Sequence, residues 1–157
     1  MPIAKLQNTS CSVSRSLAVL GERWTLLILR DALEGLTRFE EFRVSLDLAA
    51  DVLSDRLSTL VEYGLMTRVS YQEPGRRARH EYHLTDAGRE LHVIVGGLQL
   101  WGDTHLPWPG GPSTFRRSTR SGEPLRVAFV DQQGRAVPLD EVGTVHTNGY
   151  PSRRTPG

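Results

Sequence analysis

Cationic side chains gather in one short stretch of the chain. Arg76, Arg77, Arg79 and His80 follow directly after Pro74-Gly75, a pair that predicts a turn. Guanidinium groups donate strong hydrogen bonds to phosphate oxygens, so we expect a loop tip that can contact a nucleic-acid backbone. Such contacts supply affinity and salt dependence but carry no sequence information. The alternative is a solvated loop whose charges only keep the end of a sheet soluble.

A polar surface of a different kind is predicted on the segment AADVLSDRLSTLVEYGLMTR, residues 49–68. At 100° per residue, the apolar side chains share one helical face, formed by Leu53, Leu57, Leu60 and Val61. The opposite face holds only short polar side chains, namely Asp51, Ser54, Asp55 and Ser58. Serine hydroxyls and carboxylates can hydrogen-bond base edges, although carboxylates repel phosphates.

Three residues near this surface each have two interpretations. Asp51 either contacts a base or stabilises the start of its helix through the helix macrodipole. Arg56, at the edge of the apolar face, either reaches a phosphate or pairs with an acid of a neighbouring helix. Arg38 lies in the first turn of a short predicted helix, whose backbone N–H groups point in the same direction as its side chain. This arrangement favours contact with a phosphate of a nucleic-acid backbone.

Cys11 is the only cysteine, so an intramolecular disulfide and a multi-cysteine zinc site are excluded. It precedes a predicted helix, and a thiol at a helix N-terminus has a lowered pKa and higher reactivity. The thiol is either a redox sensor or a small apolar residue at a subunit interface. Sensing with one cysteine per chain would require pairing between subunits or formation of an adduct.

Composition places limits on the other chemistry that the chain can perform. The five histidines show no metal-ligand spacing, and no catalytic constellation or phosphate-binding glycine loop is present, so we expect no metal, no cofactor and no enzymatic activity. Residues 1–105 hold 12 basic and 14 acidic side chains, whereas residues 106–157 hold 7 and 4, so net charge alone does not support nucleic-acid binding. No apolar run spans a bilayer and the N-terminus lacks a signal peptide, which predicts a cytoplasmic location and no membrane partner.

Apolar spacing predicts the elements that hold these residues. Helices are expected over SVSRSLAVL, ending at Gly21, and over ERWTLLILRDAL, ending at Gly35, with the second central in the core. A capping box of Thr37 and Glu40 should begin a third helix, RFEEFRVSL. The segments LMTRVSY and HEYHLT predict a hairpin on either side of the basic tip.

A last helix is expected after Thr85, which caps it. Gly96 and Gly97 interrupt its apolar pattern and would allow close approach or a kink. Its apolar residues repeat near every 3.5 positions, a spacing that suits packing along a partner helix. They are Ala87, Leu91, Ile94, Leu98 and Trp101. Beyond the linker PWPGGPS, the segments PLRVAFVD and RAVPLDEV predict a small hairpin, and NGYPSRRTPG is expected to be disordered. The stretch TFRRSTR either adds non-specific DNA contact or is a solvated linker.

Two helices joined by a short turn and followed by a hairpin are typical of a winged helix-turn-helix, although a small helical bundle with a hairpin has the same element order. The runs CSVSRSLAVLGERWTLLILRDALEGLTRFEEF, VLSDRLSTLVEYGLMTR, EYHLTDAGREL and LWGD resemble the HxlR-type winged helix-turn-helix regulators, which are small bacterial and archaeal transcription factors. The fold class is therefore expected to be mainly α with a small β-hairpin, with a regulatory domain over 1–105 and an appendage over 106–157.

The resemblance implies a homodimer built from the first and last helices, binding a two-fold site on double-stranded DNA and answering to a small-molecule or redox inducer. The interface would hold Val13, Leu17, Leu91, Ile94, Leu98 and Trp101. Ala50-Asp51 departs from the polar or basic opening of the family's recognition helix, and the tip QEPGRRARH is about two residues longer than usual. The negative charge of residues 1–105 and the acidic helix face favour an alternative function, a protein-interaction module without DNA.

Overall fold

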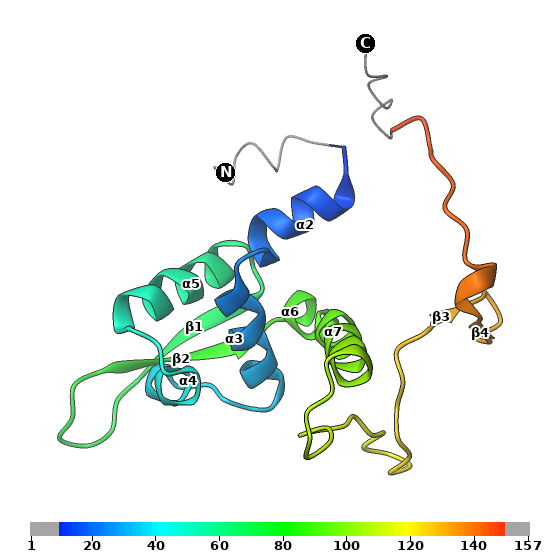
Figure 1. The fold of residues 1–157 in the computed structure, drawn as a ribbon. Helices are drawn as coiled ribbons and strands as arrows, with labels where there is room; N and C mark the ends of the chain where they lie inside the picture. The colour runs from blue at the N-terminus through cyan, green and yellow to red at the C-terminus, as the bar shows by residue number, and fades with distance from the viewer. Residues whose placement is uncertain (1–9, 150–157) are drawn as a thin grey trace. The chain divides into compact units, whose positions relative to one another are not determined.

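Helices at the predicted places surround a two-stranded sheet in the first part of the chain (Figure 1). The computed structural model describes residues 10–149. Its first compact unit ends at His92 and its second comprises Val93–Asn148. The second unit includes almost all of the last helix, and the domain expected over residues 1–105 remains a prediction.

The first unit follows the order helix, helix, short helix, longer helix, hairpin and a short helix. Its elements are α2 (Ser12–Leu20), α3 (Arg23–Leu33), α4 (Phe39–Leu46), α5 (Ala50–Glu62), β1 (Met66–Tyr71), β2 (Arg79–Leu84) and α6 (Asp86–Glu90). Helix α3 is central as predicted, since it contacts α2, α4, α5 and β2. The core is formed by side chains that are fully or almost fully buried, namely Ile28, Leu29, Phe42, Leu53, Leu57, Leu60 and Met66.

Helix α4 begins one residue later than the capping-box prediction required. Arg38 is the N-cap residue, so the third helical position is Glu41 and not Glu40. Glu41 Oε2 accepts hydrogen bonds from the backbone N–H of Thr37 at 3.0 Å and of Arg38 at 2.9 Å. Both bonds lower the pKa of the Glu41 carboxyl, and the bond from Arg38 has the larger effect. Because an arginine side chain has no acceptor, the reciprocal half of a capping box is absent.

Glu41→Gln is therefore expected to lower the free energy of unfolding by about 0.5–1 kcal/mol at pH 7. The pKa of Glu41 is lower in the folded state, so this difference is fully present above the ordinary carboxyl pKa and is lost as the pH falls through the lowered value. Urea denaturation at a series of pH values measures it. Glu40→Gln is the matched control, because Glu40 bonds only to Arg43 on the same helix in the described part of the chain, and a larger effect there would contradict the assignment.

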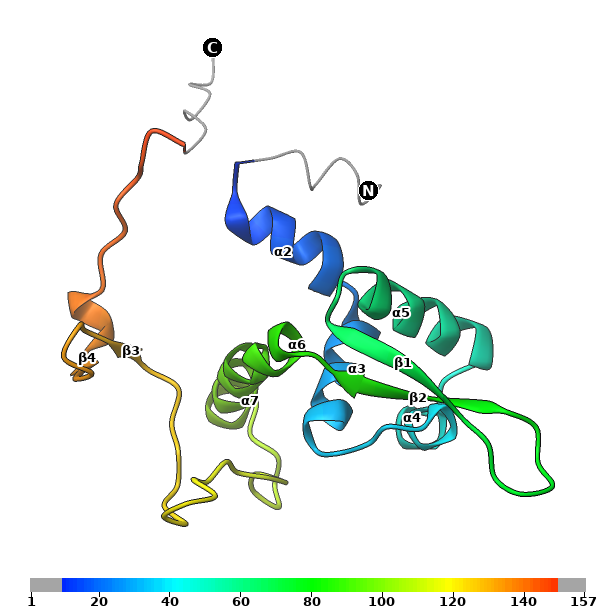
Figure 2. The ribbon, with the colours of Figure 1, turned by 180° about the vertical axis from the view of Figure 1, so that it is seen from behind.

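The hairpin has the predicted antiparallel arrangement, with Met66 opposite Leu84 and Tyr71 opposite Arg79. Its loop turns at Gly75, whose φ of 74° suits a residue without a side chain. The loop extends beyond the helices in both ribbon views (Figures 1 and 2). The main chain also joins the sheet to the start of α4, because Tyr82 N–H donates to Thr37 O at 2.7 Å and Arg38 forms a bridge with Glu81.

The prediction of a single helix after Thr85 is wrong, because the segment is divided at Leu91 into α6 and α7 (His92–His105). The Thr85 cap is confirmed, since its Oγ1 accepts from Gly88 N–H at 3.1 Å. That hydroxyl also donates to Gly64 O at 2.6 Å, so α6 is held against the turn between α5 and β1. The break therefore separates a helix fixed to the first unit from one that belongs to the second.

The second unit consists of α7 and the chain that follows it. Gly96 and Gly97 lie inside a continuous α7, and Gly96 allows the predicted close approach, since a Cβ there would lie 3.2 Å from Val127 Cγ2. The predicted small hairpin is confirmed as β3 (Phe129–Val130) paired with β4 (Ala136–Val137), followed by a short 3-10 turn, η1 (Leu139–Glu141). Most of the segment expected to be disordered, residues 150–157, lies outside the described residues. No helix among residues 10–149 is both long and apolar enough to cross a membrane.

Candidate nucleic-acid interface

The two faces of α5 divide as the sequence predicts. Leu53, Leu57 and Leu60 have no solvent exposure. On the other side, the four short polar residues are exposed, namely Asp51, Ser54, Asp55 and Ser58. Within the described residues the two serine hydroxyls have no hydrogen-bond partner, so both can donate or accept. Helix α5 thus presents a narrow polar surface that begins at its N-terminal turn.

The charges on this surface are partly paired within α5 itself. Arg56 donates from Nη2 to Asp55 Oδ2 at 2.9 Å, so it pairs with a neighbour on its own helix and not with an acid of another helix. Asp51 lies in the first turn, where a carboxylate stabilises the helix through the macrodipole. The pair reduces the repulsion that Asp55 would exert on a phosphate.

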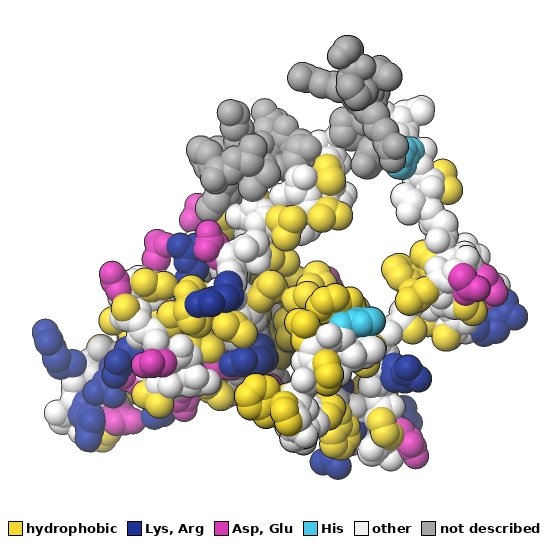
Figure 3. Space-filling model, in the orientation of Figure 1, with side chains coloured by type: hydrophobic (Ala, Val, Ile, Leu, Met, Phe, Trp, Pro, Cys, Tyr) yellow, Lys and Arg dark blue, Asp and Glu magenta, His cyan; other side chains and the backbone are white. Residues whose placement is uncertain are grey.

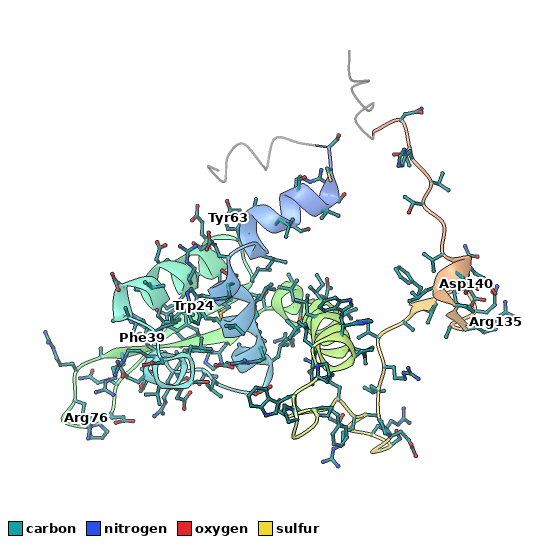
Figure 4. The ribbon with its side chains drawn as sticks, viewed as in Figure 1. Trp24, Phe39, Tyr63, Arg76, Arg135 and Asp140 are labelled. Carbon is teal, nitrogen blue, oxygen red and sulfur yellow. The ribbon has the colours of Figure 1, made fainter. Side chains whose placement is uncertain are left out.

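The hairpin loop carries the densest group of arginines, which appears in dark blue at the left of Figure 3. Arg76, at the far end of the loop in Figure 4, approaches Glu73 only to 3.8 Å and remains largely exposed. Arg77 and Arg79 are exposed and have no ion pair with any residue between 10 and 149. The guanidinium groups of Arg77 and Arg79 can therefore bind an external anion without first breaking an ion pair.

Arg38 is instead engaged by its own chain. Its guanidinium bonds to Glu81 at 3.2 Å and Glu73 at 3.3 Å, and lies over the Tyr71 ring at 4.8 Å. Glu41 also accepts from the backbone N–H groups of Thr37 and Arg38, which lie just before the first turn of α4. Arg38 therefore fastens α4 to the base of the hairpin, and a phosphate contact would require its guanidinium to leave Glu73 and Glu81.

A groove of about 530 Å³ lies between the start of α4 and the hairpin. Arg79 and His80 line it from β2, Tyr71 lines it from β1, and Phe39 lines it from α4, which leaves Phe39 half-buried although it was predicted to face inward. Glu40 and Glu41 also line the groove. These acids bring negative charge to the groove that Arg79 also lines.

Cys11 is the N-cap residue of α2 and is half-buried. Its thiol pKa is lowered, first by hydrogen bonding with the Ser14 side chain, then by the Ser14 amide, with smaller effects of the Val13 amide and the charge of Arg15. The lowered pKa agrees with the sequence prediction for a thiol at a helix N-terminus.

The apolar residues predicted for a subunit interface are accessible in each helix. On α2, Val13 and Leu17 are more than half exposed. On α7, Ile94, Leu98 and Trp101 are exposed, and Leu91 between α6 and α7 is half-buried.

Sequence reasoning missed several residues that shape this interface. Arg38 is held by Glu73, Glu81 and Tyr71. No local pattern indicates these contacts, because Glu73 and Glu81 lie 35 and 43 residues from Arg38 along the chain. Arg68 on β1 is a further exposed arginine without an ion pair in the described part of the chain. Asp31 was also missed: it is buried in α3 and bonded to Arg30 at 2.6 Å.

Helix α4, the turn at Asp47, helix α5 and the hairpin thus form a winged helix-turn-helix, in which α5 is the second helix and the hairpin is the wing. The HxlR-like helix-turn-helix family matches residues 19–108, and the chain belongs to this family of transcriptional regulators. Helix-turn-helix regulators bind DNA.

Known proteins agree with this assignment. The chain is 47% identical over 112 residues to the uncharacterised regulator Rv3095 of Mycobacterium tuberculosis, covering 71% of this chain and 70% of that protein. The crystal structure of PA1607, described as a candidate transcription factor, matches with a TM-score of 0.78 and 35% identity over 91% of this chain and 99% of that one. The redox regulator HypR in its reduced form matches with a TM-score of 0.55 and 29% identity, over 61% of this chain and 94% of that one.

Proposed function

We propose that the chain acts in the cytoplasm as a homodimer on a two-fold DNA operator, without a catalytic role. The two α5 helices enter successive major grooves about 34 Å apart, and the wings lie on the flanking backbone. Residues 1–105 supply DNA binding and dimerisation, with α2 and α7 forming the subunit interface. One observation carries the proposal: an accessible polar face on α5 belongs to the same winged domain as Arg77 and Arg79, which pair with no carboxylate of residues 10–149.

The two surfaces have separate roles in this proposal. Arg76, Arg77 and Arg79 hold phosphates and supply most of the affinity, whereas Ser54, Ser58 and the two acids of α5 discriminate between bases. A carboxylate accepts from cytosine N4, so Asp51 and Asp55 would reject other bases while weakening overall attraction. We therefore expect modest and strongly salt-sensitive affinity.

A gel mobility shift with the DNA upstream of the chain's own gene and of its neighbour tests this proposal. Retardation that weakens as salt is raised supports DNA binding. No retardation at low salt would instead support the alternative, a winged helix used only for protein interaction.

Ser54→Ala and Asp55→Asn are expected to change which operator is preferred and to leave the salt slope unchanged. Each correct base contact contributes about 1–3 kcal/mol of discrimination, so preference at one base pair of each half-site should relax by roughly 5- to 150-fold. Selection from a library of randomised duplexes measures the preference. Thr67→Ala on the hairpin is the matched control, because its hydroxyl lies outside the α5 face and bonds to His83 O at a long 3.4 Å. An identical preferred sequence in all variants would remove α5 from base recognition.

A second candidate function, response to oxidants, is favoured by the lowered pKa of Cys11 and the similarity to HypR. Diamide or a quinone is expected to release DNA from the wild type and to have no effect on Cys11→Ser. Because the lowered pKa raises the thiolate fraction near neutral pH, iodoacetamide should also label Cys11 faster than free cysteine. An equal response of both proteins to diamide would exclude sensing through this residue.

A further inference from the structure

The second unit of the chain has almost no apolar core. Eighteen large hydrophobic side chains are exposed among the described residues, and fourteen of them lie between Val93 and Val145. Of the thirteen buried hydrophobic residues in the described chain, only Val95 lies in this unit. Segments of this size depend on burial of apolar surface for stability, so another surface must cover these side chains.

The chain after α7 is nevertheless attached to that helix in a specific way. Gln99 Nε2 donates to Thr114 O at 2.6 Å and to Thr114 Oγ1 at 2.9 Å, and its Oε1 accepts from Arg116. A Cβ on Gly96 would lie 3.2 Å from Val127 Cγ2 and 3.3 Å from Arg116 Nε, so glycine permits this close approach. We call residues 114–145 the arm, because they are anchored on α7 by these contacts.

The arm and α7 expose enough apolar surface for a stable interface. The arm presents Phe115, Leu125, Phe129, Val130, Leu139 and Val145, each more than half exposed. Its two phenylalanines, Trp101 of α7 and Trp108 of the segment between α7 and the arm together expose on the order of 500 Å², since an aromatic side chain buries about 150–250 Å². A stable interface needs about 800 Å² per partner, which the aliphatic residues complete. In Figure 3 these hydrophobic side chains form yellow areas over α7 and over the hairpin of the arm.

Charge identifies the partner that fits this surface. Residues 93–148 contain five arginines and five acidic residues, so the unit has no net charge. A nucleic acid would require a basic surface, whereas two copies of a neutral apolar surface meet without repulsion. The 3.5-residue spacing of Leu91, Ile94, Leu98 and Trp101 also suits packing along an identical helix.

We propose that the arm, together with α7, packs against the second copy of this chain and forms part of the subunit interface. The proposal rests on the homodimer of the proposed function and adds to it a surface beyond α2 and α7. PA1607 matches 91% of this chain, a share large enough to include more than half of the arm, whereas HypR matches 61%.

Sedimentation equilibrium of the full chain tests the proposal with Phe115→Ser combined with Phe129→Ser. Both side chains are exposed in one chain, so the far-ultraviolet circular dichroism of the variant should match that of the wild type. Its dimer dissociation constant should rise at least about tenfold, since buried aromatic residues dominate interface energies. Val44→Ser is the matched control, because Val44 is 73% exposed on α4, like Phe115 on the arm, and should leave the dimer unchanged.

The outcomes separate the two proposals. A dimeric wild type whose dissociation constant is unchanged in the arm variant would overturn the role of the arm and leave the homodimer intact. A monomeric wild type would overturn both, while DNA binding would still be measured independently by the mobility shift. A loss of dimer in the Val44→Ser control equal to that in the arm variant would also overturn the arm as a specific surface.

Discussion

Replacing Arg77 and Arg79 together with alanine is expected to weaken binding to every duplex by on the order of 10- to 100-fold, because each charge-assisted hydrogen bond contributes about 1.5–3 kcal/mol before screening by salt. The slope of log K against log salt should fall by about 2, since each phosphate contact contributes about 0.9. Neither arginine pairs with a carboxylate among residues 10–149, so little folding stability should be lost.

Fluorescence anisotropy at salt concentrations between 50 and 200 mM measures both quantities. Arg117→Ala with Arg120→Ala is the matched control, because it removes the same charge from the stretch TFRRSTR. The wing pair should lower the slope for specific and unrelated duplexes alike, while the arm pair should leave it unchanged. An equal fall in both double variants would show that the arginines act only through net charge, and an unchanged slope in the wing variant would remove the wing from the mechanism.

Gly88→Ala is expected to lower the free energy of unfolding by at least about 2 kcal/mol, because overpacking of a closed site forces the backbone to move. A Cβ at this position would lie 2.1 Å from the carbonyl oxygen of Leu65 and 3.2 Å from the carbonyl carbon of Leu65. The obstacle is main chain at the turn between α5 and β1, which cannot rotate away as a flexible side chain can. Relief requires α6 to separate from this turn, which weakens the bond from Thr85 N–H to Leu65 O, now 3.1 Å long.

Urea denaturation measures this loss, with Gly102→Ala as the control. Gly102 also lies in a helix, but a Cβ there meets nothing within 4 Å. The same chemical change should therefore leave stability unchanged or raise it by up to about 1 kcal/mol through helix propensity. If Gly88→Ala is as stable as Gly102→Ala, α6 does not pack on the turn in the way described.

The parts of the fold that the sequence predicts are those governed by local periodicity. Leu53, Leu57 and Leu60 recur at helical spacing and are all buried, so the polar face of α5 follows directly from the pattern. The Pro74-Gly75 turn and the strands beside it were predicted for the same reason, since turn chemistry is local.

The parts that the sequence does not predict depend on contacts between distant residues. Arg38 resembles a phosphate ligand until Glu73 and Glu81, 35 and 43 residues away, are brought beside it. The break at Leu91 is equally non-local, because Gly88 meets Leu65 from the other end of the hairpin. Apolar residues repeating every 3.5 positions indicate a helix. This spacing cannot show that the helix is divided into α6 in the first unit and α7 in the second.

The account of α5 and the wing is tested most directly by a hydroxyl-radical footprint of the wild-type protein on the upstream duplex that it retards. Two identical protected regions related by a dyad are expected, with their centres about one helical turn (about 10 base pairs) apart. Flanking protection from the wings should extend each region outward. A single protected region without two-fold symmetry, or no protection at low salt, would contradict the proposed dimeric DNA complex.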